Sequence, residues 1–448
     1  MATDLEPRRL HRSRATTDVR RLLFHSVKVL LIHQYYAPLR GAFRVLFGVE
    51  QALQALGHEP IVYASQTREG LATRYASFFP RGFTRAELAR TSPLELARHA
   101  VNGIYSFPAR RGLRRLIHAT SPDAAIVFRP EYQLTYSVLS ELKANGIPAA
   151  LWLVDFRYWC SEGFLFNPTL RETCTRCVNG AHWNAVRYRC SDGSLAKSAY
   201  DATVRLVTHT ALSLHRLADR YVVPTGTTLK IATDTLALPR ERIHVIPHPM
   251  SPIETSSHPA AAQGRQVVFY GRLTPEKGLG ILLDAVARVP DLRLEIYGLD
   301  PLGREHVVRD DIERLGIADR VLLSTTLRFG EALIERLQSA AAIILPSVWP
   351  DTSDYTLLES MTLGKAVVVA SGGGNAEIVT AAGAGLVFKS GDPASLASVL
   401  SEIVAGEHDL DAMGMRGQRY VQDEYSAERF ADRVDVLLSR MADDRVRG

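Results

Sequence analysis

Short apolar runs alternate with amphipathic stretches along most of the 448 residues. Runs such as VKVLLI (27–32), AAIVFR (124–129) and AALWLV (149–154) are bounded by polar or turn-forming residues, which predicts buried strands. Between them, apolar residues recur every three or four positions, as from Val45 to Leu56, which predicts amphipathic helices. Strands that alternate with helices indicate an α/β protein with parallel, doubly wound sheets.

This alternation occurs twice, on either side of a segment rich in Ser, Pro, His and Ala. That segment, SPIETSSHPAAAQGR (251–265), has the composition of a linker. We therefore expect an N-terminal Rossmann-like domain over 27–250 and a C-terminal one over 266–425, facing each other across a cleft. A flexible basic tail (1–26) precedes them, and a polar helix (426–448) follows.

The composition is that of an ordinary globular protein, 46% hydrophobic and 23% charged. No run of eighteen apolar residues occurs, so no transmembrane helix is predicted. The polar, Arg-rich start lacks the apolar core of a secretory signal, so we expect a cytoplasmic protein. The formal net charge is +5, of which residues 1–21 supply +3, so the folded body gives little indication of a nucleic-acid partner.

A second basic cluster lies in a predicted helix and consists of Arg110, Arg111, Arg114 and Arg115. It could face a phosphorylated acceptor or an anionic membrane, as a peripheral contact at the inner membrane face. The simpler alternative is a solvated helix face.

All four cysteines fall within 156–200, a stretch that interrupts the α/β pattern. In a cytoplasmic chain, clustered cysteines indicate a metal site rather than a disulfide framework. Four thiolates suit a structural zinc ion, and His182 could replace one of them. Reduced thiols in a loop are the alternative. The candidate ligands, spaced C-x13-C-x2-C-x12-C, are Cys160, Cys174, Cys177 and Cys190.

Two carboxylates, Asp351 and Glu359, lie eight residues apart and would not share a face of one helix. They can converge only if Asp351 precedes a helix that contains Glu359. The N-cap residue types at 352–354 and the helical pattern of Tyr355–Leu363 support this arrangement. Glu359 lies among apolar residues, where an unpaired carboxylate is costly, so an internal arginine or a pair of ligand hydroxyls must donate to it. Asp351 alone could be only an N-cap.

The loop GRLTPEKG carries Arg272 and Lys277 on either side of Pro275, just after a predicted strand. A fixed loop with a guanidinium fork and a lysine point charge suits a diphosphate. The alternative is a solvated loop whose charges pair with Glu276. Further back, Asp155 ends a predicted strand, where α/β sheets place ligand-facing groups, although a turn or cap role is equally consistent.

Several motifs are similar, in order and spacing, to those of one large enzyme family. GRLTPEKGLGILLDA, PSVWPDTSDYTLLESMTLGKAVVVAS and GAGLVFKSGDPASLA resemble the nucleotide-binding domain of retaining glycosyltransferases of family 4, which have the GT-B fold. VKVLLIHQYYAPLRGAFRVLFGVEQALQALGHEPIVYAS resembles their acceptor domain. The resemblance implies transfer of a sugar from a nucleotide-diphosphate-sugar donor to an acceptor hydroxyl, with retention of configuration and without a catalytic metal.

The resemblance also implies roles for residues on the donor side. Glu359 would bind the ribose hydroxyls, Arg272 and Lys277 would hold the diphosphate, and Asp351 would touch the transferred sugar as the first acid of the E-x7-E pattern. Backbone amides would approach the phosphates at Tyr355, Thr356 and Leu357, and Gly41 matches one glycine of an N-terminal Gly-Gly loop.

The sequence departs from the family pattern in three respects. The first acid is an aspartate, Thr352 and Asp354 replace the usual glycines, and Val154 and Ala42 replace a usual histidine and glycine. A catalytic histidine at 154 is therefore not expected.

On the acceptor side we expect Asp155, and His33 facing the cleft or serving a structural role. The acceptor could be a glycan, a lipid-linked compound or a small molecule. A nucleotide-sugar 2-epimerase-like GT-B enzyme and an inactive nucleotide-sugar-binding scaffold are the alternatives.

Overall fold

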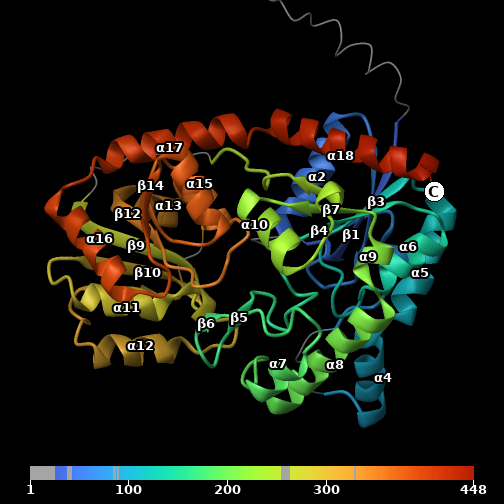
Figure 1. The fold of residues 1–448 in the computed structure, drawn as a ribbon, viewed down its shortest axis with the longest axis horizontal. Coiled ribbons are helices and arrows are strands. Elements are labelled where there is room, and N and C mark those ends of the chain that lie inside the picture. Colours follow the sequence, from blue (N-terminus) through green and yellow to red (C-terminus); the bar gives the residue numbers. More distant parts are fainter. Residues whose placement is uncertain are drawn as a thin grey trace, which may run out of the picture.

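The computed structural model describes residues 26–37, 43–83, 87, 90–253, 263–326 and 329–447. Each half of the chain builds a six-stranded parallel sheet, so the prediction of two doubly wound α/β domains is confirmed (Figure 1). The N-terminal sheet has the order β2-β1-β3-β4-β7-β8. Its strands are β1 (Lys28–Tyr35), β2 (Glu59–Ser65), β3 (Ala124–Val127), β4 (Ala149–Trp152), β7 (Arg220–Val223) and β8 (Ile243–Val245).

The C-terminal sheet has the order β11-β10-β9-β12-β13-β14, and every neighbouring pair is parallel. Apolar residues fill its central strands because both faces are covered by helices. The strands are β9 (Gln263–Arg272), β10 (Arg293–Leu299), β11 (Val321–Ser324), β12 (Ala340–Leu345), β13 (Val367–Ala370) and β14 (Gly385–Phe388).

Helices and short turns connect these strands. In the N-terminal half they are α2 (Phe43–Ala55), the 3-10 turn Ala76–Phe78, α4 (Pro93–Ile104), α5 (Phe107–Thr120), α6 (Ser137–Ala144), α7 (Trp183–Arg187), α8 (Leu195–Ala211), α9 (Leu214–Leu217), α10 (Gly226–Lys230) with the π-helical turn Ile231–Thr235, and the 3-10 turn Arg240–Arg242. In the C-terminal half they are the 3-10 turn Pro275–Lys277, α11 (Leu279–Ala287), α12 (Glu305–Arg314), α13 (Glu331–Ser339), α14 (Tyr355–Thr362), α15 (Gly374–Ala382), α16 (Pro393–Ala405), α17 (Leu410–Glu424) and α18 (Ala427–Arg447).

The cysteine-containing stretch forms a separate lobe. It holds the antiparallel pair β5 (Phe166–Asn167) and β6 (Glu172–Thr173), followed by α7, which packs on α8. Figure 1 shows α7, α8 and α4 extending together away from the N-terminal sheet.

The last helix returns to the first domain. α17 packs on α14 in the C-terminal domain, whereas α18 packs on α2 and β3 in the N-terminal domain, and both run along one edge of the molecule (Figure 1). Phe430 of α18 places its ring 6.1 Å from that of Trp152, so the helix completes the core of the N-terminal domain.

Both sheets have a topological switch point, where the strand order reverses. It lies between β1 and β3 in the N-terminal sheet and between β9 and β12 in the C-terminal sheet. In open α/β sheets, ligands bind in the crevice outside the carboxyl ends of the strands at this point. Each domain therefore offers one such crevice.

Some predicted element boundaries differ from the structure. β9 begins at Gln263, so residues 263–265 belong to the sheet and not to the linker. Residues 254–262 of the linker and residues 1–25 of the basic tail lie outside the described residues. The residue pattern of Tyr132–Asn145 predicts a helix, but the helix begins only at Ser137, because Tyr132 and Thr135 have positive φ values of 53° and 55° that a helix excludes.

The basic cluster on α5 is largely used inside the molecule. Arg110 and Arg114 both bind the buried carboxylate of Glu141, at 2.7 Å and 2.6 Å, and Arg115 lies over the ring of Phe78. This arrangement leaves fewer charges of the cluster for an external partner. None of the helices in the described part of the chain combines the length and apolarity that a membrane crossing requires.

Candidate active site

A cavity of about 790 Å³ lies between the two domains, at the switch point of the C-terminal sheet. Its C-terminal wall follows the carboxyl ends of β9 and β12 and the start of α14, and its N-terminal wall includes Arg129, Asp155 and His248. Arg272, Lys277 and Glu359 all line this one space. The volume is within the usual range for a small-molecule site. We call it the interdomain cavity.

The cationic side of the interdomain cavity comes from the end of β9 and the turn that follows it. Lys277 is nearly buried, and its Nζ lies 2.7 Å from Oδ2 of Asp354 and 5.7 Å from the ring centre of Trp349. Arg272 is the last residue of β9 rather than part of the loop, and it pairs with Glu276 at 2.9 Å. The pairing with Glu276 that we considered as the alternative therefore exists, but both cations still face the cavity.

Asp354 is the acid that faces this cation. Burial favours a raised pKa, but the Lys277 charge and hydrogen bonds from Lys277 and Asn375 outweigh it and lower the pKa of Asp354. Asp354 is also the N-cap residue of α14, whose first amides, at Tyr355 and Thr356, lack intrahelical acceptors by position. A helix N-terminus beside a lysine and an arginine is suited to hold a phosphate.

Asp351 lies beneath this loop and is not on the cavity wall. Its side chain is buried, accepts a 2.7 Å hydrogen bond from the Asn375 amide, and presses on Gly373, where a Cβ would lie only 2.3 Å from Oδ2. Burial, followed by the charge of Asp354, raises the pKa of Asp351 to about 8. Of the predicted pair, Asp351 is therefore kept away from the cavity, whereas Glu359 lines it.

Glu359 is held by a side chain from the other domain. Arg44 of α2 places Nη1 2.6 Å from Oε1 of Glu359 and its guanidinium 4.4 Å above the ring of Tyr355, while the hydroxyl of Tyr270 donates to Oε2 at 3.2 Å. An arginine thus meets the need for a donor that the sequence indicated. A ligand hydroxyl would have to share or displace this ion pair.

Four polar atoms on the cavity wall are buried and have no hydrogen-bond partner among the described residues. They are Trp349 Nε1, Ser353 Oγ, Tyr355 Oη and His248 Nδ1. Buried polar groups in native proteins are almost always paired, so these atoms indicate a place for a polar ligand or water. Ser353 also has φ 155°, a value unusual for a residue with a side chain, and such strain concentrates at ligand sites.

Three charged residues on the N-terminal wall, Arg129, Asp155 and Arg157, form a network with Glu131 behind them. Arg129 lies 3.3 Å from Asp155 and 3.4 Å from Glu131, and Arg157 lies 3.1 Å from Glu131. Asp155 is thus on the wall as predicted. His33 is not: it is buried below, with Nδ1 2.9 Å from the Tyr35 carbonyl oxygen, and burial lowers its pKa to about 3. The structural alternative therefore fits His33 better than a role in the cleft.

The other predicted donor residues are distributed as follows. Tyr355 and Thr356 line the cavity, the side chain of Leu357 is buried in the core beneath it, and Gly41 lies outside the described residues. Sequence reasoning did not single out Asp354, Arg44, His248 or Arg129 as site residues. Arg129 could have been found as the last residue of a predicted strand, and Asp354 as the residue before a predicted helix. His248, whose ring is stacked on that of Tyr355 at 5.6 Å, has no comparable signal in the sequence.

The four cysteines are free thiols, and each is partly buried. Burial, followed by the charges of the neighbouring cysteines, raises the pKa of Cys177 and of Cys190 to about 12. Within the ranges that the structure describes, no group of three or more His, Cys, Asp or Glu side chains is arranged to hold a metal ion.

The C-terminal domain matches a known family model. Residues 252–420 match Glycosyl transferases group 1. This segment contains Arg272, Lys277, Asp354 and Glu359, charged residues on the C-terminal wall of the interdomain cavity. Among curated proteins, the chain is 30% identical over 179 residues to a D-inositol 3-phosphate glycosyltransferase of Mycolicibacterium gilvum, covering 39% of this chain and 38% of that protein. It is 26% identical over 231 residues to the MMP alpha-(1->4)-mannosyltransferase of Mycolicibacterium hassiacum, covering 50% of this chain and 54% of that protein. The match thus spans roughly two fifths to half of these relatives.

Solved structures match over nearly the whole chain. Sucrose-phosphate synthase from Thermosynechococcus elongatus superimposes with a TM-score of 0.66 at 17% identity, covering 93% of this chain and 99% of that one. HepE of Anabaena in complex with UDP-glucose superimposes with a TM-score of 0.57 at 15% identity, and the match covers 92% of this chain and 99% of HepE. These matches confirm the predicted GT-B arrangement of two Rossmann-like domains.

Proposed function

We propose that this protein is a glycosyltransferase that moves a sugar from a nucleotide-diphosphate-sugar donor to an acceptor hydroxyl. The observation that carries the proposal is the shared cavity: Arg272, Lys277 and the first turn of α14 face the same space as Glu359. This arrangement suits a diphosphate at one end and ribose hydroxyls at the other. The similarity of residues 252–420 to Glycosyl transferases group 1, and of the fold to that of HepE in complex with UDP-glucose, supports it.

In the proposed reaction the bond between the anomeric carbon and the diphosphate oxygen breaks, and its electron pair leaves with the nucleoside diphosphate. The acceptor oxygen forms the new bond to the anomeric carbon, and its proton passes to a phosphate oxygen of the leaving group. Lys277, Arg272 and the amides of α14 stabilise the negative charge that develops on the diphosphate. Preorganised charges of this kind usually supply the largest catalytic contribution.

The roles of the two aspartates follow from their places. Asp351 was predicted to touch the transferred sugar, and that prediction is untested, but its burial beneath the loop favours a positioning role through Asn375. Asp354 lines the cavity and holds Lys277 in place. We propose that Asp354 orients the lysine for the diphosphate. Retention of configuration rests on the family resemblance alone, and analysis of the anomeric configuration of the product tests it.

The decisive experiment measures nucleotide binding by isothermal titration calorimetry with UDP, GDP and ADP. Glu359→Ala should weaken binding of the preferred nucleotide by about 10- to 100-fold, the usual cost of hydrogen bonds to a charged group. Glu407→Ala, which removes an exposed acid of the same domain, is the matched control and should have no effect. Unchanged affinity in Glu359→Ala would exclude the ribose contact, and binding of none of the three nucleotides would refute the donor class.

Neither the epimerase-like enzyme nor the inactive scaffold is supported by the comparisons. Incubation with donor alone separates them from a transferase, because an epimerase needs no acceptor and a scaffold releases no free sugar even after long incubation.

A structural zinc ion is a second proposal, independent of the reaction. Three of the four cysteines are followed at the third position by a glycine with positive φ: Gly163 (83°), Gly180 (87°) and Gly193 (74°). A glycine with positive φ lets the chain turn sharply after each of these cysteines, and four thiolates, or three with a histidine, form a closed zinc site. His182 is buried with both ring nitrogens unpartnered among the described residues. Binding would require these side chains to turn toward one another.

Metal analysis tests the zinc proposal. Protein purified without chelator should contain about one zinc ion per chain, the stoichiometry of a single four-ligand site. The double variant Cys174→Ser/Cys177→Ser should contain none. Metal-free wild-type protein that remains folded would refute the site.

A further inference from the structure

A second cavity, of about 1120 Å³, lies in the N-terminal domain. Its floor is formed by Gln34 and Tyr35 at the end of β1 and by Arg129, Tyr132 and Gln133 after β3, and α4 and α8 form its sides. It thus occupies the switch point of the N-terminal sheet, as the interdomain cavity occupies that of the C-terminal sheet. We call it the N-terminal cavity.

The two cavities meet at one residue. Arg129 lines both of them, and its guanidinium contacts Asp155, which lines the interdomain cavity. A ligand in the N-terminal cavity would therefore extend to the place where the proposed donor presents its sugar. This geometry makes the N-terminal cavity the natural place for the second substrate.

The walls of the N-terminal cavity present apolar and aromatic side chains to solvent. Leu96 of α4 is 50% exposed and Tyr132 is 47% exposed, although both side chains line a concave surface. Tyr132 is held with φ 53°, which is costly for a bulky residue and is typical of a functional site. Tyr200 closes the far side, where its hydroxyl donates to the carbonyl oxygen of Ala100 at 3.0 Å and so joins α8 to α4.

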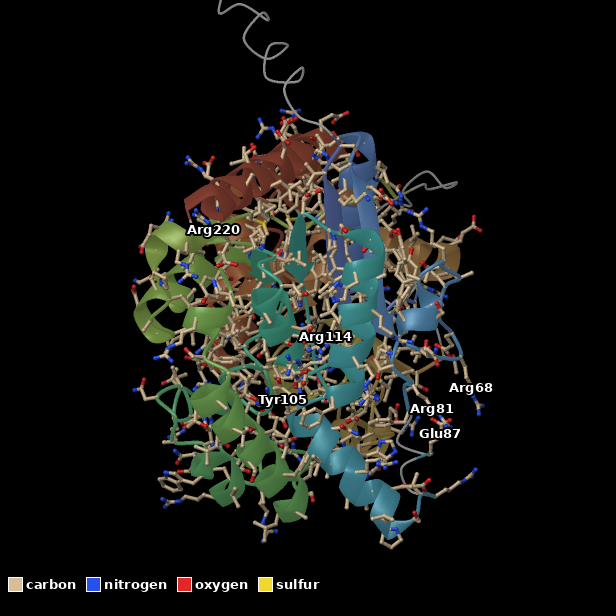
Figure 2. The ribbon with its side chains drawn as sticks, turned by 90° about the vertical axis from the view of Figure 1, so that its right-hand side faces the viewer. Arg68, Arg81, Glu87, Tyr105, Arg114 and Arg220 are labelled. Carbon is tan, nitrogen blue, oxygen red and sulfur yellow. The ribbon has the colours of Figure 1, made fainter. Side chains whose placement is uncertain are left out.

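The charged side chains that line the N-terminal cavity sum to a net charge of zero. The cavity has four basic and four acidic side chains, and the pairs include Arg68 with Glu87 at 3.9 Å and Lys197 with Asp192 at 2.6 Å. Figure 2 shows Arg68, Arg81 and Glu87 side by side at the surface of this domain. A strongly charged ligand would have to break such pairs, whereas a neutral one would not. The volume of the N-terminal cavity, about 1120 Å³, is also above the usual range for small-molecule pockets, so the cavity has room for more than a single sugar ring.

We propose that the N-terminal cavity binds the acceptor, and that the acceptor is a neutral amphiphile. Its hydroxylated part would lie at Arg129 and Asp155, and a hydrocarbon part would lie against Leu96 and Tyr132. This inference rests on the proposed glycosyltransferase function and adds to it the chemical class of the acceptor. The hydrocarbon could be an alkyl chain or an aromatic group, and the probes below distinguish them.

Calorimetric titration of wild-type protein with octyl, phenyl and methyl β-D-glucoside, below the micelle concentration of the octyl compound, tests the inference. Each buried methylene tightens binding about fourfold, so burial of even two predicts an octyl affinity at least about tenfold above that of the methyl compound. Tighter binding of the octyl compound indicates an alkyl acceptor, and tighter binding of the phenyl compound alone indicates an aromatic one. Equal affinities for all three glucosides, or no binding, would overturn the inference.

Two variants of α4 locate the binding. Leu96→Asp places a charge on the cavity wall and should remove the preference for the longer glucoside, whereas Leu94→Asp, 82% exposed and outside the cavity lining, should retain it. Both side chains are exposed, so both variants should fold. The same response in the two variants would place the binding elsewhere and overturn the inference.

Titration of the same samples with UDP, GDP and ADP keeps the two proposals separate. Nucleotide binding without discrimination among the glucosides refutes the acceptor class alone. Discrimination without nucleotide binding refutes the glycosyltransferase and therefore the acceptor role, while the cavity is still established as an amphiphile site.

Discussion

Replacing Asp351 by asparagine should change how the stability of this protein depends on pH. In the folded protein the pKa of Asp351 is raised to about 8 by burial and by the charge of Asp354. In the unfolded chain the same carboxyl group has a pKa of about 3.9. Between these values the folded state holds a proton that the unfolded state releases. Stability therefore falls as the pH rises through this window.

The size of the effect follows from the difference in bound protons. One proton costs about 1.4 kcal/mol per pH unit, so wild-type protein should lose roughly 3 kcal/mol between pH 5 and pH 7 through this group. The unfolding entropy expected for 448 residues is about 0.9 kcal/mol/K, which converts the loss to a Tm decrease of about 3 °C. An asparagine at 351 keeps a side-chain oxygen that can accept from the backbone amide of Asn375, but it cannot ionise. The Tm of Asp351→Asn should therefore not decrease in this way between pH 5 and pH 7.

Differential scanning calorimetry at pH 5, 6 and 7 measures the difference between the two proteins. Asp392→Asn is the control. This partly exposed N-cap of α16 has a pKa lowered chiefly by the hydrogen bond from the Ser395 backbone amide, so its contribution to stability is lost only as the pH falls below the tested window. Parallel curves for wild-type protein and Asp351→Asn would show that Asp351 is ionised in the folded state and would refute the reasoning. A large loss of turnover with unchanged stability would instead support the sugar contact predicted from the sequence.

Three further substitutions test the site. Lys277→Ala should lower kcat/KM by about 10²–10³ because it removes charge from the leaving diphosphate, whereas the exposed Lys389→Ala should not; equal rates in the two variants would exclude the role. Arg44→Ala should tighten nucleotide binding about fivefold in calorimetry, since ribose hydroxyls would no longer displace an ion pair worth about 1 kcal/mol; weaker binding would show that Arg44 instead orients Glu359 for the ligand. Leu358→Ala, in the buried face of α14, should lower the free energy of unfolding by about 2–5 kcal/mol in urea denaturation, and a smaller change would mean that the helix repacks around the space.

The sequence predicted the parts of the fold that local patterns determine. Apolar runs located the strands of both sheets, and the change from β9 to a turn at Pro275 placed Lys277 close to where it lies. α14 begins at Tyr355, as the N-cap types at 352–354 indicated. The ends of helices and strands were less well predicted where the backbone conformation is unusual, as at Tyr132 and Thr135, because tyrosine and threonine rarely adopt a positive φ.

The site was predicted only in part because its contacts cross between distant segments. The need of Glu359 for a donor was visible in the sequence, but the choice of Arg44 depends on how α2 faces α14 across 315 positions. Likewise, the helix start predicted between Asp351 and Glu359 suggested that the two carboxylates converge. It could not show that Asp351 turns beneath the loop toward Asn375 while Asp354 faces Lys277.

The return of α18 to the first domain has a mechanical consequence. The chain joins the two domains at two places, between β8 and β9 and again at the junction of α17 and α18 near Tyr425. Two such joints would favour rotation of the domains about the line that connects them and oppose twisting about other axes. Opening about that line would separate Arg44 of the N-terminal domain from Glu359 of the C-terminal domain, so the ion pair between them would have to break whenever the interdomain cavity opens.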